Sequence, residues 1–92
     1  MTDKLLLQKV EPLENFSLRL FYSNGVSGKI NVKNILTDAG QNDLLRGNNF
    51  YSVSIDEKTN DIIWENGFTL CKNASYRIIE LNNLTSAFKL DL

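Results

Sequence analysis

The side chains of this chain that could do chemistry are a few carboxylates and one thiol. Asp56, Asp61 and Glu65 lie close together in the sequence. A working carboxylate pair needs burial or a close partner that shifts one pKa, but these three fall among turn-forming residues, which predict exposed side chains. Cys71 precedes Lys72, whose charge could lower the thiol pKa. A lone cysteine at a strand end is more often a packing residue, so we expect no catalytic residue.

The composition excludes several other kinds of site. The chain has no histidine and one cysteine, which rules out Ser-His and Cys-His nucleophiles, zinc sites built with histidine, and sites built from several thiolates. The segment "NGVSGK" (24–29) places its glycines in a predicted hairpin and not before a helix, which disfavours a phosphate-binding loop. We therefore expect no enzyme activity, no metal and no cofactor.

Asn24-Gly25 predicts a β-hairpin turn between two alternating apolar segments. A three-residue loop at 23–25 gathers the large apolar side chains of both strands on one face, whereas a two-residue loop would divide them. A type I turn followed by a left-handed residue makes such a loop, and Gly25 stands where positive φ is needed. The pairs predicted on the shared face are Tyr22–Val26, Leu18–Ile30 and Phe16–Val32.

The same construction predicts a second hairpin in "IIWENGFTL", residues 62–70. A loop at 65–67 places Trp64 opposite Phe68, with Ile62 opposite Leu70, so the only tryptophan is expected to anchor a core. We interpret both turns as elements that reverse the direction of the backbone and take no part in a reaction. The residues assigned to this structural motif are Asn24, Gly25, Trp64, Asn66, Gly67, Phe68, Leu70 and Tyr76.

The remaining patterns complete an α+β single domain. Residues 4–10 predict a first strand closed by Pro12, which cannot donate to a β-ladder, and residues 50–55 alternate like another strand. Gly40 and Gly47 interrupt a region of short helical turns. The expected fold is a small antiparallel sheet of two hairpins, about five or six strands in all, with one or two short helices.

A helix is expected after the second hairpin. Asn73 can cap it through its side-chain oxygen, Tyr76 and Ile79 are expected to face inward, and 82–83 is expected to end it. The tail "LTSAFKLDL" (84–92) is ambiguous, because it shows both helical spacing and strand alternation. Such an apolar tail either packs on its own core or binds a partner. The candidate partner-binding residues are Leu84, Phe88, Leu90 and Leu92.

Charge and hydropathy point to a cytoplasmic protein. The net charge is −1, from ten basic and eleven acidic residues, and Arg19, Lys29, Lys33 and Arg46 are scattered without forming the basic cluster typical of nucleic-acid binders. No apolar run approaches the roughly 20 residues needed to cross a bilayer. The first residues carry too short an apolar stretch for a signal peptide. One cysteine suits a reducing compartment.

The order of these features resembles the bacterial family called domain of unknown function 2442, over residues 6–77. Its "WPNG" signature followed by an apolar residue and "DL" corresponds to 64–70, with Glu65 in place of the proline and Thr69 in place of the aspartate. On this basis 1–77 is the domain that resembles the family, and 78–92 is a helix end and apolar tail of the same domain. The residues that carry the resemblance are Val10-Glu11-Pro12-Leu13, Phe16, Leu18, Leu20, Phe21, Asn24-Gly25, Val32, Leu36, Phe50, Val53, Asp56, Ile63-Trp64-Glu65-Asn66-Gly67, Leu70 and Tyr76.

The resemblance implies a small α+β fold, no known catalytic activity, and gene pairs that look like toxin–antitoxin modules. Our leading hypothesis is a non-catalytic, antitoxin-like protein-binding module that uses a sheet edge and the apolar tail, with a homodimer as a further possibility. The alternatives are a phage or mobile-element inhibitor of a host defence nuclease, and a weak nucleic-acid-binding regulator. An enzyme would require a ligand over Trp64 in contact with Glu65.

Overall fold

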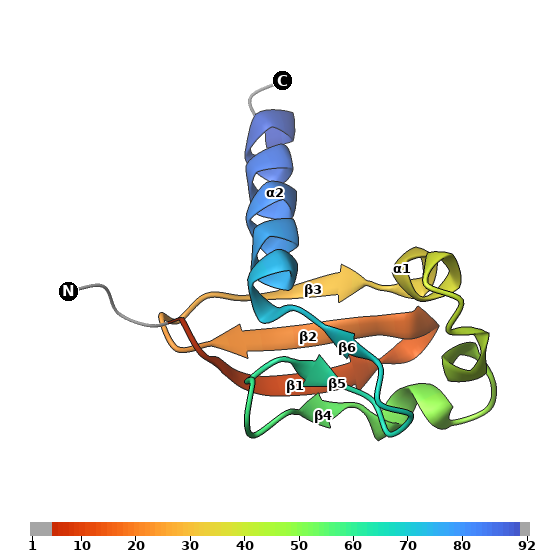
Figure 1. The fold of residues 1–92 in the computed structure, drawn as a ribbon. Helices are drawn as coiled ribbons and strands as arrows, with labels where there is room; N and C mark the ends of the chain where they lie inside the picture. The colour runs from red at the N-terminus through yellow and green to blue at the C-terminus, as the bar shows by residue number, and fades with distance from the viewer. Residues whose placement is uncertain (1–4, 91–92) are drawn as a thin grey trace.

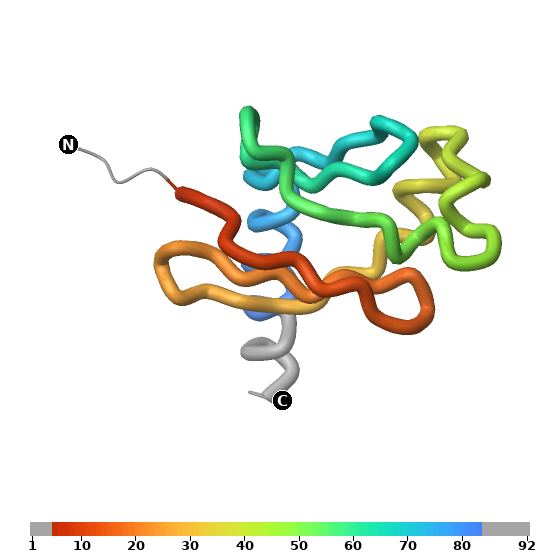
Figure 2. The backbone as a smooth tube through the Cα atoms, turned by 90° about the horizontal axis from the view of Figure 1, so that it is seen from below, coloured from red at the N-terminus to blue at the C-terminus, as the bar shows by residue number. Residues whose placement is uncertain are grey.

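The computed structural model describes the backbone of residues 5–90 and the side chains of residues 5–83. Within these residues six strands form two three-stranded antiparallel sheets, ordered β1-β2-β3 and β4-β5-β6. Two α-helices and short 3₁₀ turns complete the chain. Figure 2 shows the two sheets as separate layers, with the helical turns at one end. The predicted α+β single domain is confirmed, with its strands divided between two sheets.

The first sheet has the register predicted from the apolar pattern. Leu18 lies opposite Ile30, and the Tyr22 N–H donates to the Val26 carbonyl at 2.9 Å. The Val32 N–H donates to Phe16 in the same way, also at 2.9 Å. The strands of this sheet are β1 (Leu7–Leu13), β2 (Ser17–Tyr22) and β3 (Ser27–Asn31).

The expectation that Pro12 closes the first strand is wrong, because β1 continues to Leu13. Pro12 lies opposite Leu18. Leu18 belongs to the set of β2 residues that bond to β3, and hydrogen-bonded and non-bonded pairs alternate along antiparallel strands. The proline nitrogen therefore points away from β2, at the edge of the sheet, where no ladder hydrogen bond is lost.

The second sheet confirms the other predicted hairpin. Ile62 pairs with Leu70, and the Trp64 N–H donates to the Phe68 carbonyl at 3.0 Å. The strands are short: β4 (Ser54–Ile55), β5 (Ile62–Ile63) and β6 (Thr69–Leu70).

The strand expected over 50–55 is wrong in its first half, where a 3₁₀ turn, η3 (Asn49–Ser52), replaces it. Phe50 is buried and Val53 packs against the core, whereas Tyr51 is 49% exposed. An inward spacing of three residues fits a 3₁₀ turn, which repeats every three residues. The expected short helical turns are confirmed. They are α1 (Lys33–Asp38) and η2 (Asn42–Leu45), and a further turn, η1 (Glu14–Phe16), joins β1 to β2.

The second helix, α2 (Lys72–Leu90), begins and ends at other residues than expected. Asn73 lies inside its first turn. The Lys72 N–H donates to the Asp61 carboxylate at 3.0 Å, and an oxygen acceptor at this place satisfies one of the free N–H groups of a helix start. The helix also continues through 82–83, since asparagine in a helix interior costs only a few tenths of a kcal/mol.

Helix α2 packs on the first sheet through Ile79. A Cβ on Gly28 of β3 would lie 2.6 Å from Ile79 Cγ2, so the helix approaches the strand where the strand has no side chain. The predicted inward residues Tyr76 and Ile79 are confirmed, the first partly and the second fully buried. Beyond this contact the helix rises past β3 and extends away from both sheets (Figure 1).

The core lies between the two sheets, the helical turns and the start of α2. Trp64, Tyr22 and Phe50 are its largest buried side chains. Apolar burial on this scale contributes about 25 cal/mol per Å² removed from water. The buried apolar residues are Leu7, Leu18, Leu20, Tyr22, Ile30, Val32, Leu36, Leu44, Phe50, Ile62, Trp64 and Ile79.

Candidate functional site

The two Asn-Gly turns have the same internal geometry. In each, the asparagine Oδ1 accepts a hydrogen bond from the N–H two residues later, Val26 in the first turn and Phe68 in the second, both at 3.0 Å. Gly25 and Gly67 have φ of 87° and 91°, a region that side-chain-bearing residues avoid. Both pairs therefore set backbone direction, as their sequence predicts.

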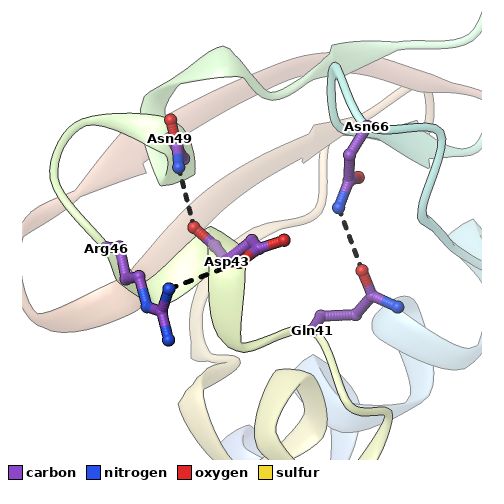
Figure 3. Close-up of polar contacts among 5 residues, drawn as sticks. All are labelled: Gln41, Asp43, Arg46, Asn49 and Asn66. Carbon is purple, nitrogen blue, oxygen red and sulfur yellow. Dashed lines mark hydrogen bonds and ion pairs between the residues drawn. The ribbon is translucent and has the colours of Figure 1, made fainter.

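The side-chain amide nitrogen of each turn asparagine is not needed within the turn, and it donates a hydrogen bond to a residue far away in the sequence. Asn24 Nδ2 donates to the Tyr76 hydroxyl at 3.0 Å, which ties the first turn to α2. Asn66 Nδ2 donates to Gln41 Oε1 at 3.0 Å, which ties the second turn to the helical region (Figure 3). The asparagines thus connect separate parts of the fold.

Trp64 is a core residue. It is 1% exposed, its ring centroid lies 5.9 Å from that of Phe68, and its Nε1 donates to the Phe50 carbonyl at 3.0 Å. A buried indole N–H needs such an acceptor. The indole therefore faces the core.

A surface depression of roughly 360 Å³ lies beside the second turn, a volume in the range of small-molecule pockets. It lies where η2 and η3 meet the turn at 65–67. Its lining residues are Asp43, Leu44, Asn49, Ser52, Glu65 and Asn66.

Hydrogen bonds fix the walls of this depression. Asn49 Nδ2 donates to the Asp43 carbonyl at 2.9 Å, and Arg46 approaches the Asp43 carboxylate at 3.8 Å (Figure 3). Across the depression, the Glu65 N–H donates to Ser52 Oγ at 3.2 Å. The hydroxyl in turn donates to the Asn49 carbonyl at 2.8 Å. These bonds hold the backbone and the Asn49 and Ser52 side chains in place, and the carboxylates of Asp43 and Glu65 remain at the surface.

The depression offers carboxylate and amide oxygens. Asp43 and Arg46 are largely exposed, and exposed ion pairs contribute little. No cluster of three His, Cys, Asp or Glu side chains suited to a metal occurs among the described residues. The arrangement can accept hydrogen bonds from a cationic or N–H-rich group.

Two other titratable side chains, Asp56 and Tyr22, form hydrogen bonds that stabilise the fold. Asp56 lies in the predicted polar turn, and the N–H groups of Thr59 and Lys58, at 3.1 and 2.7 Å, lower its carboxyl pKa. Burial raises the pKa of Tyr22, assisted by Cys71 and Tyr76. The Tyr22 hydroxyl donates to the Lys72 carbonyl at 3.0 Å.

Two of the four cations named from the sequence are brought together. Arg19 and Lys29 lie opposite each other in the β2–β3 register, and both are exposed on the solvent face of the first sheet. Lys9 of β1 lies on the same face, 3.4 Å from Glu11 and 5.6 Å from the Phe21 ring centroid. By contrast, Lys33 begins α1 and Arg46 pairs with Asp43.

The partner-binding residues expected in the tail fall at the limit of the described chain. Positions 84, 88 and 90 are helical, which settles helix over strand as far as Leu90. The side chains of Leu84, Phe88 and Leu90 lie outside the described set, and Leu92 lies outside the described residues altogether. Helix α2 also runs unbroken across the expected boundary between 77 and 78.

Sequence reasoning missed the residues whose roles depend on distant partners. Asp43, Asn49 and Ser52 line the depression, and Asp61 accepts a hydrogen bond from the first residue of α2. In the sequence, all four look like ordinary turn residues. The one available signal was the density of turn formers in 40–49, which marks irregular backbone. Spacing alone could not show that this segment meets the turn at 65–67.

Comparison with protein-family models, curated proteins and solved structures gives no match. The resemblance to domain of unknown function 2442 therefore stays a prediction. Among the described residues, no helix combines the length and apolar character required to cross a membrane.

Proposed function

We propose that this chain is a non-catalytic protein-binding module, antitoxin-like in role. It holds its partner with a sheet edge and with the outer half of α2, residues 81–90. The supporting observation is the position of α2, whose second half extends past both sheets with no other element of the described chain beside it (Figure 1). Isolated helices of this length are marginal in water, so a helix that leaves its own core gains stability from a partner.

The sequence of α2 gives this outer half a recognition face. Leu81 is 56% exposed, and Leu84 and Phe88 follow at intervals of three and four, which is the spacing of one helix face. Position 88 comes nine residues after Ile79, or two and a half turns. Positions 81, 84 and 88 therefore lie on roughly the opposite side of the helix from Ile79, whereas position 90, eleven residues after Ile79 or about three turns, lies on the same side as Ile79. Proteins that bind a helix in a groove contact apolar side chains at this spacing.

The test is partner capture from the native host, followed by reconstitution with the purified partner. We expect the wild-type chain to bind, and a chain ending at Asn83 to lose at least tenfold in affinity by calorimetry. Glu80→Ala is the matched control, an exposed change on the same helix, and should bind normally. Trp64 emission verifies folding of each variant. Unchanged affinity of the shortened chain would contradict the proposal.

A further inference from the structure

The free edge of β3 is the sheet edge that the hydrogen-bond pattern leaves open. Tyr22 and Val26 form a bonded pair, and bonded and non-bonded pairs alternate along antiparallel strands. The N–H and C=O groups of Ser27, Lys29 and Asn31 therefore point away from β2. All three residues are exposed, so a row of backbone donors and acceptors faces outward.

The opposite edge of the same sheet is occupied at Leu7. Asn60 Oδ1 accepts from the Leu7 N–H at 2.7 Å, and Asn60 Nδ2 donates to the Leu7 carbonyl at 3.0 Å. This side chain takes the place that a neighbouring strand would hold. Farther along β1, Pro12 has no N–H to offer an added strand, so β3 has the longer row of outward-pointing donors and acceptors of the two edges.

Through the side chains that the structure describes, up to residue 83, α2 contacts β3 on its core side. Ile79 packs on Gly28, on the core side of the strand. Asn82 and Asn83 follow three and four residues later, on the same helix face, and both are exposed. An extended segment added along β3 would therefore have the Asn82 and Asn83 amides near one of its faces, the face on the core side of the sheet. Its other face would be exposed to solvent.

The charge beside this edge favours an acidic occupant. Lys29 and Arg19 lie opposite each other, and like charges at such a position are destabilising. Glu11 of β1 lies on the other side of Arg19, so Lys29, on the edge strand, is the cation of this row that has no carboxylate opposite it. Neither side chain forms an ion pair among the residues that the structure describes. A carboxylate on an added strand, opposite Lys29, would relieve this repulsion. A second copy would instead bring two such basic rows onto one face, and an edge lysine disfavours self-pairing.

We propose that β3 binds an extended acidic segment of a partner protein by strand addition, with a carboxylate placed against Lys29. This inference rests on the proposed protein-binding function and specifies its sheet edge and the chemistry of its partner. Main-chain hydrogen bonds to Ser27, Lys29 and Asn31 supply affinity, and the charges select the acidic segment, as in other complexes formed by strand addition.

The test uses two synthetic peptides, one alternating glutamate with valine and one alternating lysine with valine. Titration up to millimolar peptide, followed by ¹H–¹⁵N spectra, should shift the amides of Ser27, Lys29 and Asn31 and slow their hydrogen exchange with the glutamate peptide only. Lys29→Glu should reverse the peptide preference. The absence of shifts at these amides, or equal binding of both peptides, overturns the inference.

A backbone variant separates strand addition from surface charge. Ser27→Pro removes one outward N–H without changing charge, at an edge position where proline is tolerated, and should weaken the glutamate peptide at least fivefold. Ser27→Ala is the matched control and should bind normally. If Ser27→Pro does not fold, the peptide preference of Lys29→Glu still tests whether the acidic peptide binds beside β3. Protection of β3 amides in a dimer, without peptide, assigns the edge to a second copy and overturns the acidic segment.

The outcomes also separate this inference from the proposed function. If partner affinity falls on removing 84–92 but is unchanged in Ser27→Pro and Lys29→Glu, the edge assignment fails while the protein-binding function stands. If both edge variants lose the partner while the shortened chain keeps it, the edge stands and the role of α2 fails.

Discussion

Asn60 holds Leu7 through both of that residue's backbone polar groups, although the two residues are 53 positions apart. The amide accepts from the Leu7 N–H and donates to its carbonyl, so one side chain reproduces the pairing of a strand. Asn60 can reach this position because its backbone adopts φ of 63°, which asparagine tolerates better than most residues. The contact joins the turn before β5 to the edge of the other sheet.

Replacing Asn60 should therefore loosen the junction of the two sheets. We expect Asn60→Gly, which keeps the positive φ easy, to lower the free energy of unfolding by about 1–3 kcal/mol, because a partly buried donor and acceptor on Leu7 lose their partners. Asn60→Ala should cost more, since it adds backbone strain. Urea unfolding measures both. Equal stability of Asn60→Gly and wild type would contradict the role assigned to this amide.

Gly28→Ala should disturb the docking of α2. The new methyl group would stand 2.6 Å from Ile79 Cγ2, and overpacking of this kind costs about 1–3 kcal/mol. In a double-mutant cycle Ile79→Ala should recover part of the loss, with a coupling of about 1 kcal/mol. Thermal unfolding provides the values, and Ser27→Ala is the neighbouring control. Strictly additive losses would show that α2 does not rest on this glycine.

Trp64→Phe should be costly and specific. It removes buried volume and leaves the Phe50 carbonyl without the donor that lies 3.0 Å away, so we expect a loss of about 2–4 kcal/mol. Tyr51→Phe, at an exposed position, should change stability by less than about 0.5 kcal/mol. In the wild-type protein the indole emission should be blue-shifted and resist acrylamide quenching. Ready quenching in the folded state would refute burial of Trp64.

Asp56 should give the turn at 56–61 a pH-dependent contribution to stability. The N–H groups of Thr59 and Lys58 lower the pKa of this carboxyl from its ordinary value of 3.8. The folded state thus favours the ionised form, and the stabilisation is full above the ordinary pKa and is lost as pH falls through the lowered one. Wild type should exceed Asp56→Asn in unfolding free energy at pH 7. The difference should shrink toward pH 3, and a constant difference would contradict this assignment.

The hairpins were predictable in register because their information is local. Asn24-Gly25 and Asn66-Gly67 each need one residue with positive φ and one side chain that accepts a nearby N–H, and the apolar alternation on either side then allows a single pairing. Trp64 was predictable as a core residue for the same reason. The division of the strands into two sheets was not, since it depends on which faces meet across the core.

The depression shows the limit of local patterns at the candidate site. Glu65 and Asn66 were visible in the sequence as turn residues, but their neighbours across the depression, Asp43 and Asn49, come from a segment about twenty residues earlier. Such a meeting is fixed by the burial of Leu44 of η2 and Phe50 of η3 in the core that also holds Trp64. No spacing rule in the sequence encodes it.

The sequence by itself determined the two turns, the apolar faces of their strands and the inward residues of α2, because each follows from interactions within a few residues. Only the tertiary structure decided that Asp61 meets the first turn of α2, that Asn60 closes the edge at Leu7, and that Pro12 stays within a strand. Each of these depends on a backbone group whose partner lies far away in the chain. Hydrogen-bonding capacity can be satisfied by any nearby donor or acceptor, so the folded arrangement, and not the local pattern, selects the partner.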